Sequence, residues 1–157
     1  MSKRMMVIGA ALVLAATGLA RADAPGFGPD DVVKARQSGM LLSAADLGAI
    51  RRIADTGAEP KSLGFQAGAL KHWAATLPIM FPAGTGPGQI KGATEARAEI
   101  WSDRAGFDKA LAGYIEATSK LADLAKANDA PGFKAQAAAV AASCKSCHTA
   151  YRLEAKH

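Results

Sequence analysis

The chain has 157 residues, 50% of them hydrophobic and 6% aromatic, with 19 basic residues, 14 acidic ones and a formal net charge of +5. This length suits one domain with a single hydrophobic core. Three of the basic residues, Lys3, Arg4 and Arg21, lie in the first 22 positions, so the rest of the chain keeps 16 basic residues and a net charge of only +2. It has no basic run or aromatic-interleaved patch. We therefore expect no nucleic-acid partner.

Residues 1–22 have the features of a secretory signal peptide. The segment 2–4 (SKR) is charged, residues 5–16 are almost entirely apolar, and Ala20-Arg21-Ala22 has the small-x-small pattern of a cleavage site. An apolar run of about 12 residues is too short for a membrane span, which takes about 20. We expect cleavage after Ala22, a mature chain of residues 23–157 without a membrane span, and export. The compartment is the periplasm if the source is a Gram-negative bacterium.

The mature chain shows a helical period of apolar residues throughout and no alternating strand pattern. The first helix is expected from about Asp30, after the breaker run at residues 25–29, to about Thr56, with Gly57 ending it. Its inward stripe comprises Val33, Arg36, Met40, Ala44, Leu47 and Ile50.

The second helix is expected from about Lys61 to Pro78, with Leu70, Trp73 and Leu77 directed inward. The glycine- and proline-rich stretch at residues 81–92 then predicts a long connection rather than a regular element.

The third helix is expected after Trp101-Ser102-Asp103, and the fourth opens at Asp129-Ala130-Pro131, an N-cap followed by an early proline. The apolar line of the fourth helix alternates spacings of four and three, which is typical of the seam of a bundle helix. Four helices with mostly short connections predict an all-α fold, an antiparallel up-down-up-down four-helix bundle. The residues expected to face inward are Phe107, Leu111, Tyr114, Thr118 and Leu121 in the third helix, and Phe133, Ala137, Val140, Cys144, Cys147 and Tyr151 in the fourth.

The fourth helix carries Cys144-Lys145-Ser146-Cys147-His148, the C-x-x-C-H pattern by which haem is attached covalently. The two thiols form thioethers with the porphyrin vinyl groups, and the adjacent imidazole supplies an axial nitrogen to the iron. Positions i, i+3 and i+4 of a helix share one face, so all three side chains can meet one edge of the macrocycle. The motif predicts one covalent haem c, bound through Cys144 and Cys147, with His148 as a metal ligand.

Other uses of this motif fit less well. A zinc site needs about four ligands, and the chain has only these two cysteines. A thioredoxin-like redox pair would follow a strand in a βαβ unit, which the helical pattern does not provide. The remaining alternative is an ordinary helix face that carries two small residues and a histidine.

A sixth ligand to the iron has few candidates. No methionine follows His148, and the mature chain keeps only Met40 and Met80. Met40 lies midway along the inward stripe of the first helix, where a partner helix can face the haem, whereas Met80 lies at the mouth of the long loop. We expect Met40 to be the distal metal ligand, and the alternative is ordinary core packing. His72 and His157 are expected at the surface.

Together these motifs resemble the class II c-type cytochromes, the family of cytochrome c-prime and its low-spin relatives. The resemblance covers residues 30–155 and is carried, in the same order, by residues 33–40 (VKARQSGM), 99–101 (EIW) and 144–152 (CKSCHTAYR). The sequence around Leu77-Pro78 and residues 81–85 (FPAGT) is closer to the low-spin branch.

The resemblance also implies roles for residues outside the C-x-x-C-H motif. Met40 falls at the family's distal position, which packs over an open iron in some members and binds it in low-spin members. Arg36 matches an arginine that contacts the haem, with Gln37 beside it, and Arg152 matches a basic residue near the proximal imidazole. For both arginines the alternative is a solvated charge with a packed aliphatic stem. Glu95 matches a loop position that approaches the haem in some members.

Two functional classes remain. As an electron carrier, the protein would cycle its haem between ferrous and ferric states, with a His148–Met40 ligand field raising the potential. As a gas-binding protein, it would take NO or CO at a five-coordinate iron on the Met40 side. We expect electron transfer with redox partner proteins, with gas binding as the alternative. We expect no enzyme activity, because the sequence shows no nucleophile–base set beyond the haem motif.

A homodimer through the first two helices occurs in the family. Charged residues on the outer faces of those helices leave the oligomeric state of this chain open, namely Arg51, Arg52, Lys61 and Lys71.

Overall fold

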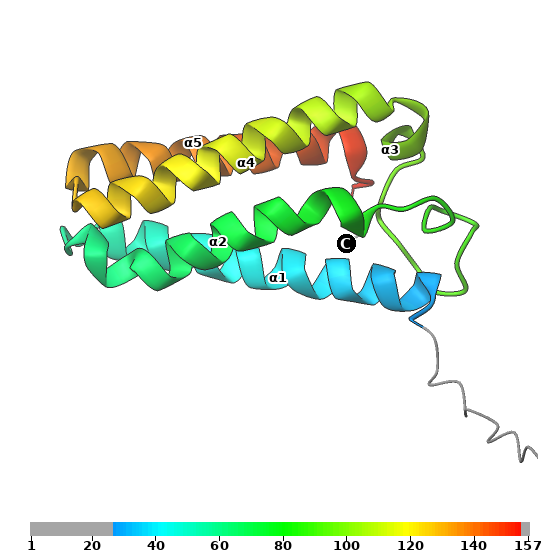
Figure 1. The fold of residues 1–157 in the computed structure, drawn as a ribbon, viewed down its shortest axis with the longest axis horizontal. Helices are drawn as coiled ribbons and strands as arrows, with labels where there is room; N and C mark the ends of the chain where they lie inside the picture. The colour runs from blue at the N-terminus through cyan, green and yellow to red at the C-terminus, as the bar shows by residue number, and fades with distance from the viewer. Residues whose placement is uncertain (1–26, 155–157) are drawn as a thin grey trace, which may run out of the picture.

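The structure, a computed structural model, describes residues 27–154 and consists of two antiparallel helix pairs packed against each other (Figure 1). One pair is α1 (Pro29–Ala54) with α2 (Gly64–Thr76), and the other is α4 (Arg104–Ala127) with α5 (Ala130–Tyr151). Contacts join α1 to α2 and α5, and join α4 to α5 and α2, so each long helix has two neighbours in a square. The four-helix bundle expected from the sequence is confirmed.

Shorter elements frame α2 and α4. The 3-10 turns η1 (Pro60–Leu63) and η2 (Leu77–Met80) flank α2, and the single turn α3 (Glu99–Ser102) precedes α4. The sequence predicted one continuous second helix and did not predict α3, because a single turn is too short to show an apolar period. Within residues 27–154, no helix is both long enough and apolar enough to cross a membrane. The expected signal peptide, its cleavage site and His157 lie outside the described residues.

Local chemistry explains where the last two long helices start. The Asp103 side chain accepts a hydrogen bond from the Gly106 amide at the start of α4, and Asp129 accepts one from the Gly132 amide at the start of α5. Such caps satisfy amides that have no partner within the helix. Asn128 ends α4 with a left-handed φ of 58°, a conformation that asparagine tolerates better than most residues. The turn into α5 is therefore short.

The core follows the predicted stripes. Each large apolar side chain that is fully buried adds about 1.5–3 kcal/mol to the free energy of unfolding. The buried residues of the stripes therefore supply most of the driving force for packing the helices together. One expectation was wrong: Ala44 of the first stripe is exposed, while Met40 and Leu47 are half-buried. The buried members of the stripes are Val33, Arg36, Ile50, Leu70, Leu77, Phe107, Leu111, Tyr114, Thr118, Leu121, Phe133, Ala137 and Val140.

The indole ring of Trp73 on α2 packs against α1 at Gly39. A Cβ atom at this position would overlap the indole ring of Trp73. Only glycine therefore lets the ring lie directly on α1, one residue before Met40. Trp73 itself is half-buried, as a residue expected to face inward should be.

The connection between η2 and α3 is longer than expected, running over residues 81–98. It lies at the end of the bundle where α1 begins and α5 finishes (Figure 1). Its only β-type pairing is an isolated antiparallel bridge between Ala96 and Arg152. The loop thus meets the end of α5 just after the C-x-x-C-H motif.

Candidate haem site

The three residues of the C-x-x-C-H motif lie on one uninterrupted helix. Cys144, Cys147 and His148 fall in the last two turns of α5, and all three are half-buried. Both cysteines are free thiols, and both pack against the core cluster. Because α5 continues to Tyr151, the i, i+3 and i+4 positions present the two sulfurs and the imidazole on one side of the helix.

The thiols have the properties of buried groups. Burial raises the pKa of Cys144, and burial together with the nearby Cys144 raises the pKa of Cys147 to about 11. Both are therefore protonated at neutral pH. A redox-active C-x-x-C pair instead has a lowered pKa at a helix N-terminus, and these thiols lie near the C-terminus of α5. Within residues 27–154, no three His, Cys, Asp or Glu side chains are grouped in a way that could hold a metal ion.

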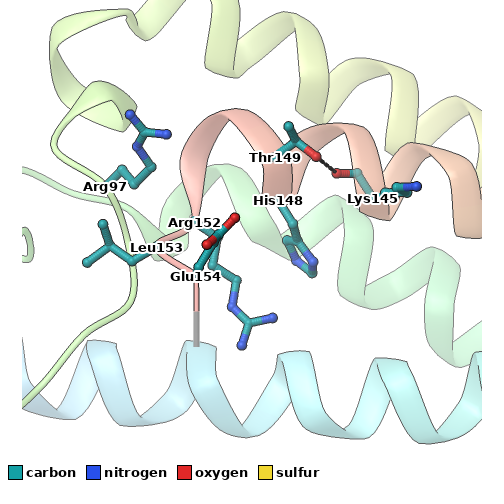
Figure 2. A pocket seen from close by; sticks show the side chains of 7 residues that line it. All are labelled: Arg97, Lys145, His148, Thr149, Arg152, Leu153 and Glu154. Atoms are coloured by element: carbon teal, nitrogen blue, oxygen red, sulfur yellow. Dashed lines mark hydrogen bonds between the residues drawn. The ribbon is translucent and has the colours of Figure 1, made fainter. Parts of the chain in front are cut away.

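His148 borders an open pocket of about 650 Å³ at the end of α5 (Figure 2). Burial and the neighbouring charge of Arg152 lower the pKa of His148, and Glu95 partly opposes them. The neutral imidazole favoured in this way is the form that binds a metal. In Figure 2 the side chains of His148, on α5, and Arg152, just beyond α5, extend to the same side. The pocket is lined by Arg97, Lys145, His148, Thr149, Arg152, Leu153 and Glu154.

Arg152 is held by the long loop. Its Nε donates to Glu95 Oε2 at 2.7 Å, and the side chains of the pair are 45% and 51% exposed. Arg152 lines the same pocket as His148. Whether it contacts haem stays a prediction.

Arg36 is the most deeply buried charged side chain of the described residues, with 3% of its surface exposed. Its Nη1 donates to Thr85 Oγ1 at 3.0 Å and to the Met80 carbonyl at 3.4 Å. Its Nη2 donates to the Thr85 carbonyl at 2.8 Å and to Thr94 Oγ1 at 2.9 Å. The guanidinium also lies over the ring of Phe81, 4.8 Å from its centroid. Arg36 thus fixes the loop to α1.

No carboxylate among residues 27–154 forms an ion pair with Arg36. Burial alone lowers its pKa. A buried cation without a counter-ion is costly, so an anionic group nearby would be favourable. Haem carries two propionates that could serve in this way. The donor set fits haem c: two thiols and an imidazole on one helix face, and an uncompensated cation on a neighbouring helix.

Gln37 has a smaller share in fixing the loop. Its side chain is exposed, and Nε2 donates to the Ala93 carbonyl at 3.1 Å. The haem contacts expected of Arg36 and Gln37 stay predictions, because the structure shows both residues bound to the loop.

Arg36→Ala should destabilise the protein by about 3 kcal/mol, since it removes several hydrogen bonds and leaves buried acceptors without a donor. Chemical denaturation measures the loss. Gln37→Ala is the matched control, because this exposed neighbour makes a single bond to the same loop. Equal losses for the two variants would contradict the role of Arg36 in fixing the loop.

The two methionines differ in setting. Met40 is half-buried on α1 and packs against the core cluster, as do Cys144 and Cys147. Met80 ends η2, where its carbonyl accepts from Arg36. The distal role of Met40 stays a prediction. His72 is exposed on α2, in agreement with the surface position expected.

Sequence reasoning missed the residues through which the loop is anchored. Thr85 is 1% exposed and holds Arg36 with both its hydroxyl and its carbonyl. Trp101 Nε1 donates to the Pro82 carbonyl at 3.1 Å. Because a loop has no apolar period, nothing in the sequence distinguished Thr85 from the other residues of the loop.

Comparisons with known proteins agree with this site. The family model described as cytochrome c' matches residues 31–152. The cytochrome c' of Alcaligenes xylosoxydans xylosoxydans is 36% identical over 124 residues, covering 79% of this chain and 94% of the relative. A solved nitric oxide complex of a cytochrome c prime variant from Alcaligenes xylosoxidans superposes with a TM-score of 0.72 at 32% identity, covering 81% of this chain and 97% of that one. A carbon monoxide-bound variant gives a TM-score of 0.72 at 32% identity, covering 81% and 98%.

These relatives all carry the name cytochrome c', and nothing in the comparisons supports the low-spin branch suggested by the loop sequence. The family consists of haem proteins rather than enzymes, as expected from the sequence. With its C-x-x-C-H motif on the last helix of a four-helix bundle, the chain belongs to the cytochrome c' family, and its cofactor is one covalently bound haem c.

Proposed function

We propose that this protein binds NO or CO at the iron of a haem attached to Cys144 and Cys147, with His148 as the axial ligand. The observation that carries the proposal is the near-complete overlap with relatives whose solved structures hold nitric oxide or carbon monoxide. The chain covers 97% and 98% of those structures. Gas binding therefore takes precedence over the electron transfer expected from the sequence.

When bound, haem supplies an iron that takes a small uncharged gas. The chain's own residues hold and shield it. Cys144 and Cys147 would hold the macrocycle on α5, and the neutral imidazole of His148 would supply the nitrogen lone pair that binds the iron. Met40 packs on the opposing α1 and supplies an apolar wall that excludes larger or more polar ligands.

Single-electron transfer is the second candidate. The placement of Met40 favours it, because its thioether lies on α1, a neighbour of α5, and packs against the same core cluster as the two cysteines, so it could serve as a sixth ligand. In that case Met40 would close the iron to gases, and redox proteins would be the partners. The two candidate functions therefore require different roles of Met40: packing over an open iron for gas binding, and binding the iron for electron transfer.

The visible spectrum of the reduced wild-type protein, recorded before and after adding CO, tests the proposal. An open iron should give a high-spin spectrum that shifts immediately with CO, and NO should bind as well. Sharp, split low-spin bands that resist CO would overturn the gas-binding proposal and favour electron transfer.

Export forms part of the proposal. The pattern of residues 1–22 supports secretion to the periplasm, the compartment in which the mature chain would acquire its haem. A homodimer through α1 and α2 stays an open expectation, and sedimentation of the haem-loaded protein at micromolar concentrations would decide it.

A further inference from the structure

Two adjacent residues of the long loop hold arginines from opposite sides of the site. Thr94 Oγ1 accepts from Arg36 Nη2 of α1 at 2.9 Å. Glu95 Oε2 accepts from Arg152 Nε, just beyond α5, at 2.7 Å. Since one peptide unit separates Thr94 from Glu95, the position of the first arginine constrains that of the second.

Main-chain bonds attach the same segment to the end of α5. The Arg97 amide donates to the Tyr151 carbonyl at 3.0 Å, and the Leu153 amide donates to the Glu95 carbonyl at 2.7 Å. Ala96 and Arg152 form the isolated bridge between these two bonds. We call residues 94–97 the strap. It joins α1, through Arg36, to the residues that follow His148.

We propose that Glu95 is a positioning residue, which holds the Arg152 guanidinium in the wall of the His148 pocket and so sets the charge beside the proximal imidazole. Arg152 directs two of its nitrogens, Nε and Nη2, at the same Glu95 oxygen, and such charge-assisted contacts hold the guanidinium against the carboxylate. The proposal rests on His148 being the axial ligand.

An exposed ion pair on mobile side chains ordinarily contributes little. The Arg152–Glu95 pair differs because main-chain hydrogen bonds hold the backbones of both residues side by side. Their side chains therefore start from fixed positions. Arg152 lines the pocket together with His148. Without the Glu95 carboxylate, a full positive charge would remain beside the proximal ligand, and a positive charge favours the ferrous state.

The test uses the haem-loaded protein without any gas and compares Glu95→Gln, Arg152→Gln and the double variant. Amide hydrogen exchange is followed by mass spectrometry in peptides covering residues 94–97 and 152–154, and the midpoint potential is measured by spectroelectrochemistry. Glu95→Gln should speed exchange about tenfold at these amides, because the strap loses its side-chain anchor. It should also raise the potential. Arg152→Gln should speed exchange equally and lower the potential.

The double variant separates positioning from a general loss of stability. If Glu95 acts through Arg152, exchange in the double variant should be no faster than in either single variant. Additive effects would overturn the proposal, as would a Glu95→Gln protein with an unchanged potential.

Asp108→Asn is the matched control. Arg104 pairs with Asp108 at 2.9 Å, and these side chains are 43% and 52% exposed, close to the values of the Arg152–Glu95 pair. This variant should change neither readout, and a shift equal to that of Glu95→Gln would count against a specific role. Neither hydrogen exchange nor the midpoint potential involves a gas, so a protein that binds no gas would still give both results. A protein that attaches no haem would be recognised at once, because no haem-loaded protein would be obtained.

Discussion

Replacing Cys144 and Cys147 together with alanine should abolish covalent haem attachment and leave little stable loaded protein. The thioethers are the bonds that hold haem c after denaturation. Both cysteines pack against the core, so the attached macrocycle would complete part of that core. Denaturing electrophoresis with haem staining and intact mass spectrometry measure the effect. For the wild type, we expect the mass of the chain from Asp23 plus one haem.

Ser146→Ala is the control for this pair of substitutions. Ser146 lies between the cysteines but is exposed, so its loss should leave attachment intact. Haem that leaves the wild-type chain on acid–organic extraction would disprove the assignment. A disulfide between Cys144 and Cys147 in the exported protein would disprove it too.

Met40→Ala should raise the affinity for CO about tenfold or more while leaving the resting spectrum unchanged. On the gas-binding proposal, an entering ligand must displace the Met40 side chain, and removing that steric cost of about 1.4 kcal/mol or more changes the affinity by this factor. Titration of the reduced protein with CO, together with stopped-flow rates, measures the change.

Met40→Leu distinguishes packing from ligation. Leucine has a similar volume but no sulfur, so a residue that only packs over the iron should be replaced with little change in CO affinity. If the Met40 sulfur binds iron, Met40→Leu should instead resemble Met40→Ala: both would turn a low-spin protein that resists CO into a high-spin one that binds it. That outcome would favour the electron-transfer function and reject a purely steric role for Met40.

The chemistry of the site was readable from the sequence because it lies within one turn of helix. Cys144, Cys147 and His148 need only helical geometry to share a face, and the structure provides that helix up to Tyr151. The bundle was readable for a related reason. Apolar residues at helical spacing must be buried, so lines such as Phe107–Leu111–Tyr114 identify their own inner face.

The sequence was less informative where contacts join distant parts of the chain. Arg36 was expected against haem, and the structure shows its guanidinium bound to Met80, Thr85 and Thr94. Ala44 fits the helical period but is exposed in the structure. Neither result follows from periodicity, which gives the face of a helix but not what lies opposite it.

The sequence by itself determined the four helices, the C-x-x-C-H face and the likeness to cytochrome c-prime, because each is recognised from short segments of chain and needs no knowledge of which segments touch. Only the tertiary structure decided how residues 81–98 cross the end of the bundle, so that Arg36 reaches Thr94 and Glu95 reaches Arg152. Those pairs are 58 and 57 residues apart in the chain. They meet because the bundle brings the start of α1 and the end of α5 together at one end, and no local pattern of residues records that closure.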